Sequence, residues 1–156
     1  MRWWDIEPVM ELELRLFPED AWSRGMYWSE LADARPGGSR HYTVATTADG
    51  AVAGYAGLMA VGAESDVQTI AVAEEHQGRG LGALLLGDLI AESARRGCDE
   101  LLLEVRVDNV RAQRLYERYG FIPVGIRRGY YQPANVDALV MRLDHETTNH
   151  TEEDHG

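Results

Sequence analysis

Two glycine-rich spacings overlap in the middle of the chain, in the segment EEHQGRGLGALLL. Gly78, Gly80 and Ala83 fit G-x-G-x-x-A, a pattern typical of dinucleotide-binding loops. Gln77, Gly80 and Gly82 fit a different pattern, Q-x-x-G-x-G. Either loop would point backbone N–H groups at a phosphate, because the start of a helix carries free N–H groups and a positive dipole end. The segment therefore predicts a phosphate-bearing ligand, and a tight turn without a ligand is the alternative.

Two common phosphate-binding folds do not fit this segment. A P-loop ends in G-K-[ST], whose lysine contacts the phosphates, and the segment contains no lysine. A dinucleotide-binding fold needs repeated parallel strand–helix–strand units and usually begins with one. Glu100 lies at a suitable distance for a ribose contact, but only one such unit is visible, and hairpins flank it. The Q-x-x-G-x-G spacing is therefore the one to explain.

The loop has to lie between a strand and a helix, and the hydrophobic patterns predict both. Residues 66–73 are typical of a strand, and apolar residues recur at helical spacing from the loop to about Arg96. Asp49 and Gly50, between two β-prone runs, predict a hairpin. The other predicted elements are a short strand through Trp3 and Trp4, a helix capped by Asp5 and ended by Pro18, a short helix from near Trp28 or Ser29, strands at about 41–47, 51–60 and 100–105, a helix from Asn109 to Gly120, and strands at about 121–128 and 136–143.

These elements predict one α/β (α+β) domain over residues 1–143. The pieces 66–73, 78–96 and 100–105 form a central β-α-β crossover, so the two strands should run parallel. The other strands suit antiparallel pairing, which gives a mixed, mostly antiparallel sheet of about six or seven strands with about four helices. Residues 144–156 are polar and without periodicity, and we expect an acidic, disordered tail there.

Composition narrows the class of partner and the location. The chain has 156 residues and a formal net charge of −11, which argues against nucleic acid and suits a cationic substrate. No apolar run approaches the roughly 20 residues of a membrane span, and no signal peptide is visible, so we expect a cytoplasmic protein without a membrane partner. Cys98 is the only cysteine, and His145, His150 and His155 lie five residues apart, so no metal site is expected.

With this order of elements, the chain resembles the GCN5-related N-acetyltransferase (GNAT) family over about residues 1–143. In that family the Q-x-x-G-x-G motif holds the pyrophosphate of acetyl-CoA at a helix start, and the preceding strand lies beside the pantetheine arm. The matching segment here is TIAVAEEHQGRGLGALLL. The resemblance implies acetyl-CoA as cosubstrate and the following residues as its binding site: Ile70, Ala71, Val72, Gln77, Gly78, Arg79, Gly80, Leu81 and Gly82.

The downstream block LLLEVRVDNVRAQRLYERYGFIPVGIRRGYYQP resembles the bacterial branch that acetylates the N-terminal alanine of a ribosomal protein. The resemblance implies that Glu104 is the general base, Tyr116 the general acid and Asn109 a cofactor contact. The residues alone leave other roles open: Glu104 could pair with Arg106 or Arg128, Tyr116 could be a core aromatic, and Asn109 could be a helix cap. A carboxylate that accepts the amine proton and a phenol that protonates the leaving thiolate would suit acetyl transfer.

Substrate selection is expected to involve the aromatic residues Trp22, Tyr130 and Tyr131, in segments rich in acids and tyrosines. An acidic groove with aromatic edges would suit a basic protein or peptide N-terminus, and the resemblance implies ribosomal protein eighteen of the small subunit. The family's FPW turn is only partly kept, as FPEDAW. Two alternatives stay open: an acetyltransferase for protein lysines or small amines, and a non-catalytic acyl-CoA-binding module.

Overall fold

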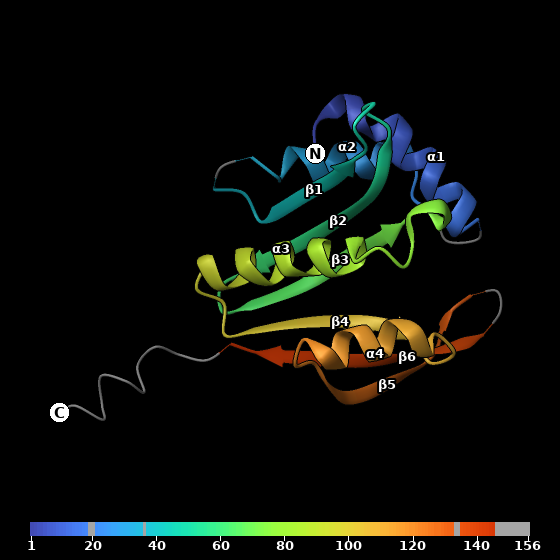
Figure 1. Cartoon of the computed structure of the whole chain (residues 1–156). Coiled ribbons are helices and arrows are strands. Elements are labelled where there is room, and N and C mark those ends of the chain that lie inside the picture. Colours follow the sequence, from blue (N-terminus) through green and yellow to red (C-terminus); the bar gives the residue numbers. More distant parts are fainter. Residues whose placement is uncertain (19–20, 36, 133–134, 146–156) are drawn as a thin grey trace.

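The computed structural model describes residues 1–18, 21–35, 37–132 and 135–145. These residues form one open sheet with helices on both faces (Figure 1). The helices are α1 (Ile6–Leu16), α2 (Arg24–Ala32), α3 (Leu81–Arg95) and α4 (Val110–Arg118), with 3-10 turns at Trp3–Asp5 and Glu74–His76. The strands are β1 (Arg40–Thr46), β2 (Val52–Val61), β3 (Glu64–Val72), β4 (Glu100–Arg106), β5 (Ile122–Tyr131) and β6 (Val136–Asp144). Among these described helices, none is long and apolar enough to cross a membrane.

The sheet has the strand order β1-β2-β3-β4-β6-β5. β3 and β4 run parallel, joined by α3, and every other neighbouring pair is antiparallel. This arrangement confirms the predicted fold class: a mixed, mostly antiparallel sheet with one central β-α-β crossover. Six strands and four α-helices are present among the described residues, within the expected range.

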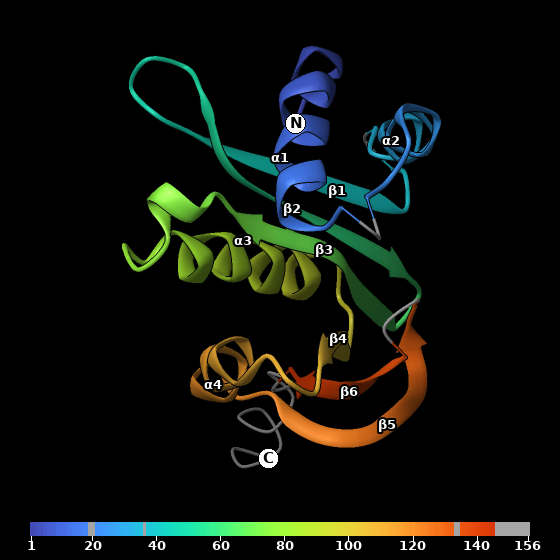
Figure 2. The same ribbon diagram turned by 90° about the vertical axis from the view of Figure 1, so that its right-hand side faces the viewer.

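Helices α1 and α2 lie on one side of the sheet and α3 and α4 on the other (Figure 2). Two hydrophobic clusters hold these helices to the sheet. One cluster packs α3 and α4 against β2, β4 and β6, with Leu86, Leu89 and Leu101 fully buried. The other packs α1 and α2 against the opposite face, where Val9 and Tyr27 are fully buried. Helices α1 and α3 therefore each bury one apolar stripe, as their helical spacing predicted.

The parallel strands β3 and β4 stay paired only at their beginning. Backbone pairing joins Glu64–Asp66 to Glu100–Leu102, and no pairing continues beyond it (Figure 1). β3 also carries a β-bulge where it pairs with β2. Gly57 pairs with Thr69 and Leu58 with Val67, so Gln68 has no partner residue on β2. The second halves of the two strands are thus free to line a site between them.

The N-terminal strand expected at Trp3 and Trp4 is wrong. These residues form a 3-10 turn, in which the Asp5 carboxylate accepts a hydrogen bond from the Arg2 N–H at 2.8 Å. Both tryptophans are more than half exposed, at 62% and 52%, and contact each other edge to face. Consecutive aromatics suggested a strand, but the local Asp5 cap closes a turn instead.

Three other boundaries differ from expectation. α2 begins at Arg24 rather than near Trp28, because Ser23 is a capping residue whose Oγ accepts the Met26 N–H at 3.2 Å. β5 extends to Tyr131, so the tyrosines expected in a loop lie on a strand. β6 includes Asp144, and the His145 ring contacts Ser93 at 2.8 Å, so the fold reaches past 143. The tail beyond 145 lies outside the described residues.

Candidate active site

The glycine-rich loop leads from β3 into α3 through two glycines with a left-handed backbone. Gly78 and Gly80 both have a φ of 80°, which residues with a Cβ rarely adopt. Gly80 is the N-cap of α3, so the free N–H groups of the first helical turn follow it directly. The Gln77 side chain donates from Nε2 to the Val72 carbonyl at 3.0 Å and holds the loop against β3. The loop is shaped as an anion-binding turn at a helix start.

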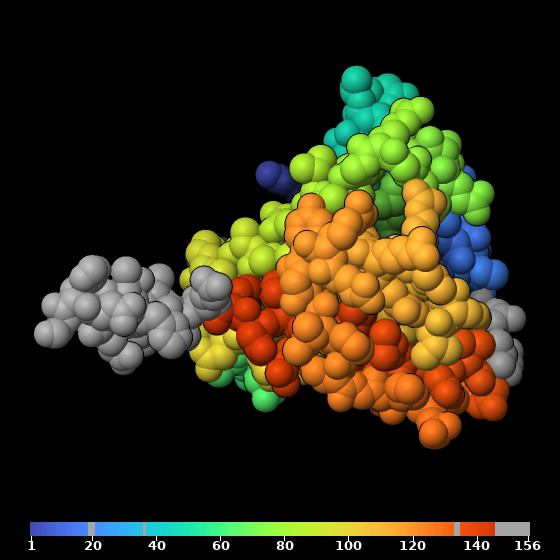
Figure 3. All heavy atoms as spheres, turned by 60° about the horizontal axis from the view of Figure 1, so that its bottom comes forward, coloured from blue at the N-terminus to red at the C-terminus, as the bar shows by residue number. Residues whose placement is uncertain are grey.

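A cavity of about 670 Å³ lies between this loop, the end of β3, and α4. In Figure 3, the green residues of the loop and the orange residues of α4 face each other across this hollow. The predicted cofactor residues that line it are Ile70, Ala71, Val72, Gln77, Gly78, Gly80, Gly82 and Asn109. Arg79 and Leu81 belong to the same loop and helix start but are not among the lining residues. The structure thus gathers most of the predicted set around one cavity.

Positive charge on the far wall of this cavity was missed in the sequence. Arg111 and Arg118 both line it from α4. Nη2 of Arg111 lies 3.7 Å from the position that a Cβ on Gly78 would occupy. In a chain of net charge −11, these guanidinium groups favour an anionic ligand at this place. Their spacing of seven residues puts them on one helix face, a signal that a helical projection would have revealed.

α4 also carries two residues that the sequence singled out. Asn109 caps the helix, since its Oδ1 accepts the Ala112 N–H at 3.1 Å, and it lines the cavity as well. Tyr116 is 7% exposed, lines the same cavity and packs its ring 5.9 Å from that of Phe121. Burial raises the pKa of Tyr116 to about 12. Its hydroxyl therefore stays protonated near neutral pH and is available as a proton donor.

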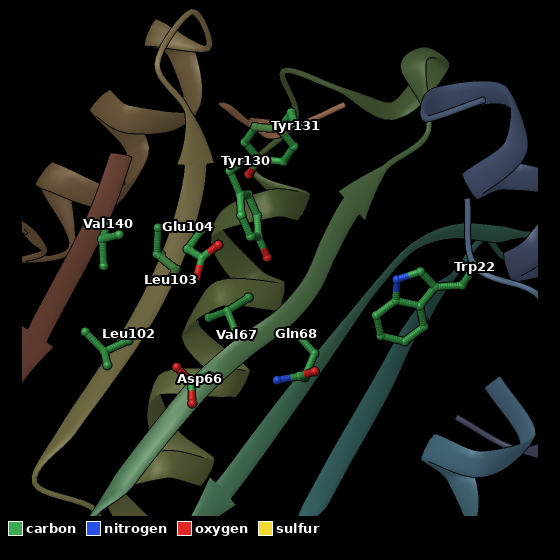
Figure 4. A pocket seen from close by; sticks show the side chains of 10 residues that line it. All are labelled: Trp22, Asp66, Val67, Gln68, Leu102, Leu103, Glu104, Tyr130, Tyr131 and Val140. Atoms are coloured by element: carbon green, nitrogen blue, oxygen red, sulfur yellow. The ribbon is translucent and has the colours of Figure 1, made fainter. Parts of the chain in front are cut away.

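A second cavity, of about 690 Å³, lies where β3 and β4 separate (Figure 4). The three predicted substrate residues, Trp22, Tyr130 and Tyr131, all line it, and so does Glu104. Trp22 comes from the loop before α2, and the tyrosines from the end of β5. The pair of tyrosines meets edge to face, with ring centroids 5.1 Å apart. Residues from distant parts of the chain therefore form one aromatic, acidic wall.

One carboxylate oxygen of Glu104 accepts a hydrogen bond, and the other has no hydrogen-bond partner among the described residues. Nη1 of Arg127 donates to Glu104 Oε1 at 2.7 Å, and the same guanidinium lies 4.2 Å from the centre of the Tyr130 ring. Glu104 Oε2 is buried and has no hydrogen-bond partner of normal geometry among the described residues. Arg127, which was not considered from the sequence, is thus a partner of Glu104. A carboxylate oxygen left free in a cavity can accept a proton.

Tyr131 lies near both candidate catalytic residues. Burial, followed by the charge of Glu104 and the neighbouring Tyr130, raises the pKa of Tyr131 to about 12, and Tyr116 also contributes. The two cavities also share β3, since residues 66–68 line the second and residues 70–72 line the first. The two cavities therefore lie along successive parts of the same strand.

Asp66 is a functional candidate that the sequence reasoning missed. It lines the second cavity together with Glu104. Among the described residues, the Asp66 side chain forms no ion pair and no hydrogen bond. Burial raises the pKa of Asp66, and the nearby carboxylates of Glu64, Glu104 and Glu100 raise it further. Asp66 pairs with Leu102 across the parallel strands, so only the register brings it close to Glu104. The cavity thus has a second carboxyl group near its candidate base.

Comparisons with known proteins show which family this chain belongs to. The sequence model described as the Acetyltransferase (GNAT) family matches residues 6–121. A relative from Mycobacterium tuberculosis, named N-alpha-acetyltransferase RimI, is 40% identical over 145 residues, which cover 90% of this chain and 87% of that protein. A relative from Salmonella typhimurium, named ribosomal protein bS18-alanine N-acetyltransferase, is 42% identical over 118 residues, which cover 74% of this chain and 80% of that protein.

A solved structure is similar over nearly the full length. The crystal structure of the ribosomal-protein-S18-alanine N-acetyltransferase from Escherichia coli superposes with a TM-score of 0.81 and 32% sequence identity. The match covers 96% of this chain and 94% of that chain.

Proposed function

This chain belongs to the acetyltransferase (GNAT) family, and we propose that it moves an acetyl group from acetyl-CoA to the α-amine of an N-terminal alanine. The proposed protein substrate is ribosomal protein bS18, because relatives at 36% to 42% identity carry that substrate in their names. A cytoplasmic location would follow from a ribosomal substrate. The observation that carries the proposal is the pair of cavities, one beside a phosphate-binding loop with Tyr116 and one with Glu104.

The first cavity fits coenzyme A by the chemistry of its walls. The α3 start and the φ of 80° at Gly80 present N–H groups suited to a pyrophosphate, and Arg111 adds a positive charge. Gly82 leaves the first helical turn without a side chain beside Leu115 and Val72. When bound, acetyl-CoA would supply an acetyl thioester. The residues that would hold it are the loop glycines, the end of β3 and the start of α4.

The second cavity fits an amine that has to lose a proton. An α-amine has an ordinary pKa near 8 and a lysine near 10.4, so neutralising them at pH 7 costs about 1.4 and about 4.6 kcal/mol. Glu104 Oε2, which is buried and without a partner, would accept that proton directly or through one water. Tyr116 would donate its proton to the sulfur as the thioester bond breaks, since a thiol has an ordinary pKa near 8.5.

Two alternative functions use the same cavities, one with a different acceptor and one without catalysis. An acetyltransferase for lysines or small amines could use the same two residues, and a non-catalytic acyl-CoA-binding module could use the first cavity alone. The acid and base candidates in adjoining cavities favour catalysis over binding. The aromatic wall and the free Asp66 favour a cationic peptide over a small amine.

A pair of peptides separates these functions. The enzyme is given acetyl-CoA and a peptide that begins Ala-Arg-Tyr, and separately the same peptide with a blocked α-amine and one free lysine. Mass spectrometry locates the acetyl group. We expect acetylation of the free α-amine at a rate at least about tenfold above that of the lysine, because the lysine costs more to deprotonate. Equal or faster acetylation of the lysine would reject the N-terminal function, and transfer to neither would favour the binding module.

A substitution at Gly82 tests the first cavity. Gly82→Val would place a branched side chain on the cavity wall, and we expect it to weaken coenzyme A binding by at least about tenfold, measured by calorimetry. Gly87→Val is the matched control, because Gly87 lies on the same helix, has open space around its Cβ position and does not line the cavity. Both variants replace a helical glycine by the same residue, so the change in intrinsic helix propensity is similar. If both bind coenzyme A equally well, the cofactor lies elsewhere.

A substitution at Asp66 tests the acceptor side. An extended strand advances about 3.3 Å per residue, so Asp66, which pairs with Leu102, lies about 7 Å along the strand from Glu104. An α-amine at Glu104 would then bring the second or third side chain of the peptide near Asp66. We expect Asp66→Asn to lower kcat/KM for an Ala-Arg-Tyr peptide by about five- to tenfold, while an Ala-Ala-Ala peptide changes less than about twofold. An equal loss for both peptides would remove Asp66 as a selectivity residue.

A further inference from the structure

Glu13 is a buried carboxylate that takes no part in the proposed acetyl transfer. It lies on α1 and is 3% exposed. Its Oε2 accepts the backbone N–H of Trp22 at 2.5 Å, and its Oε1 accepts the Tyr55 hydroxyl at 3.1 Å. Among the described residues no ion pair is made by Glu13. One side chain thus joins helix α1, strand β2 and the segment before α2.

Stability alone gives no reason for a carboxylate at this place. Burying a charge without a cation is costly, and an apolar residue of similar volume often stabilises a core better. A carboxylate in such a place instead selects one arrangement of the donors around it. Burial, and next the Glu13 carboxylate, raises the pKa of Tyr55, so its hydroxyl remains a donor. The arrangement of Trp22 is therefore what Glu13 specifies.

The two residues that donate to Glu13, Trp22 and Tyr55, lie in or next to the two cavities. Trp22 lines the second cavity (Figure 4). Its ring centroid lies 5.2 Å from that of the fully buried Tyr27. Tyr55 pairs with Ala71 across β2 and β3, and Ala71 lines the first cavity. The Glu13 carboxylate therefore connects the segment that carries Trp22 with the strands beside the expected thioester.

We propose that Glu13 is a positioning residue, which sets the place of Trp22 for the acceptor peptide through the Trp22 N–H and the Tyr55 hydroxyl. This inference rests on the proposed peptide acceptor and goes beyond it by assigning a role to a residue that touches neither ligand. Without the carboxylate, the Trp22 backbone loses its anchor while the first cavity and the candidate catalytic residues keep their own contacts.

The fold offers a matched control. Tyr42 donates its hydroxyl to Glu30 Oε1 at 2.7 Å, a second tyrosine–carboxylate bond between a helix of the same layer and the sheet. Neither Tyr42 nor Glu30 lines either cavity. Tyr42→Phe therefore removes a similar bond of similar burial without touching the anchor of Trp22.

The test compares Glu13→Met, which keeps the length of the side chain but has no carboxylate acceptor, and Tyr55→Phe with Tyr42→Phe. We expect the first two to raise KM for an Ala-Arg-Tyr peptide by about tenfold, with coenzyme A affinity within about twofold of wild type. We expect Tyr42→Phe to lower the melting temperature but to leave the peptide KM within about twofold. If the peptide KM of all three variants changes alike, the proposal is rejected. Tyr55→Phe keeps the ring and stays informative if Glu13→Met fails to fold.

A second measurement does not depend on activity. The hydrogen exchange of the Trp22 amide, followed by NMR in the protein without ligand, should be slow in wild type and in Tyr42→Phe, and faster by about tenfold in Glu13→Met. Unchanged exchange in Glu13→Met would overturn the proposal. A wild-type protein that acetylates no peptide would reject the proposed function instead, and the exchange result would still decide the role of Glu13.

Discussion

Tyr116→Phe is expected to lower kcat by about 10²- to 10³-fold while coenzyme A binding stays within about twofold of wild type. The change removes one hydroxyl and keeps the ring that packs on Phe121, so the core around α4 is preserved. What is lost is the proton for the leaving sulfur. A thiolate would then have to leave without protonation, or take a proton from water that the buried site admits poorly.

The pKa of Tyr116 gives this prediction a pH signature. Burial raises that pKa to about 12, so the hydroxyl stays protonated from pH 6 to well above pH 10. Ionisation of Tyr116 should therefore cause no loss of wild-type turnover in the range up to about pH 10. A stopped-flow or steady-state pH profile of kcat measures this directly.

The control for Tyr116 lies one helical turn away. Tyr119 is on the same helix end and lines the same cavity, but it is 39% exposed. Tyr119→Phe should keep kcat within about threefold, because an exposed hydroxyl is not the required donor. If Tyr116→Phe turns over like wild type, or if both variants lose kcat equally, Tyr116 is not the general acid.

Glu104→Gln is expected to lower kcat/KM at pH 7 by about 10²- to 10⁴-fold, which is the usual contribution of a general base. The amide keeps the size of the side chain but cannot accept the amine proton. The loss should shrink by about tenfold between pH 7 and pH 9, because an α-amine with an ordinary pKa near 8 becomes mostly neutral without help. Rates measured across this range, with the Ala-Arg-Tyr peptide, check both statements.

A control acid lies on the same strand. Glu100 belongs to β4, pairs with Arg142 at 3.8 Å and lines neither cavity. Glu100→Gln should leave kcat/KM within about threefold at every pH. A Glu104→Gln variant whose loss is independent of pH would contradict its role as the base, and would point to a structural role through Arg127.

The features that were predicted correctly depend on short stretches of sequence. The loop from Gln77 to Gly82 was recognised because its glycines supply both the left-handed turns and the helix start within six residues. Gly97 and Gly120 likewise end α3 and α4 with left-handed backbone, at φ values of 78° and 96°. Local conformational preference and the family pattern agree at these places, so sequence reasoning suffices.

The features that were missed depend on contacts between distant strands. Asp66 comes near Glu104 only because β3 pairs with β4. Arg127 extends from β5 across β6 to form its hydrogen bond with Glu104. Strand register and side-chain reach across a sheet are not encoded in any single segment. The N-terminal strand was wrong for the opposite reason, because the pattern of Trp3 and Trp4 was given more weight than the Asp5 cap.

The central claim is that acetyl donor and peptide acceptor meet between the two cavities, at Tyr116 and Glu104. The direct measurement is a crystal structure with coenzyme A and an Ala-Arg-Tyr peptide bound together. The account predicts the thiol sulfur within about 3.5 Å of the Tyr116 hydroxyl, and the peptide α-amine within about 3 Å of Glu104 or one water away from it. A thiol that points away from Tyr116, or a peptide amine outside the cavity of Glu104 and Asp66, would contradict it.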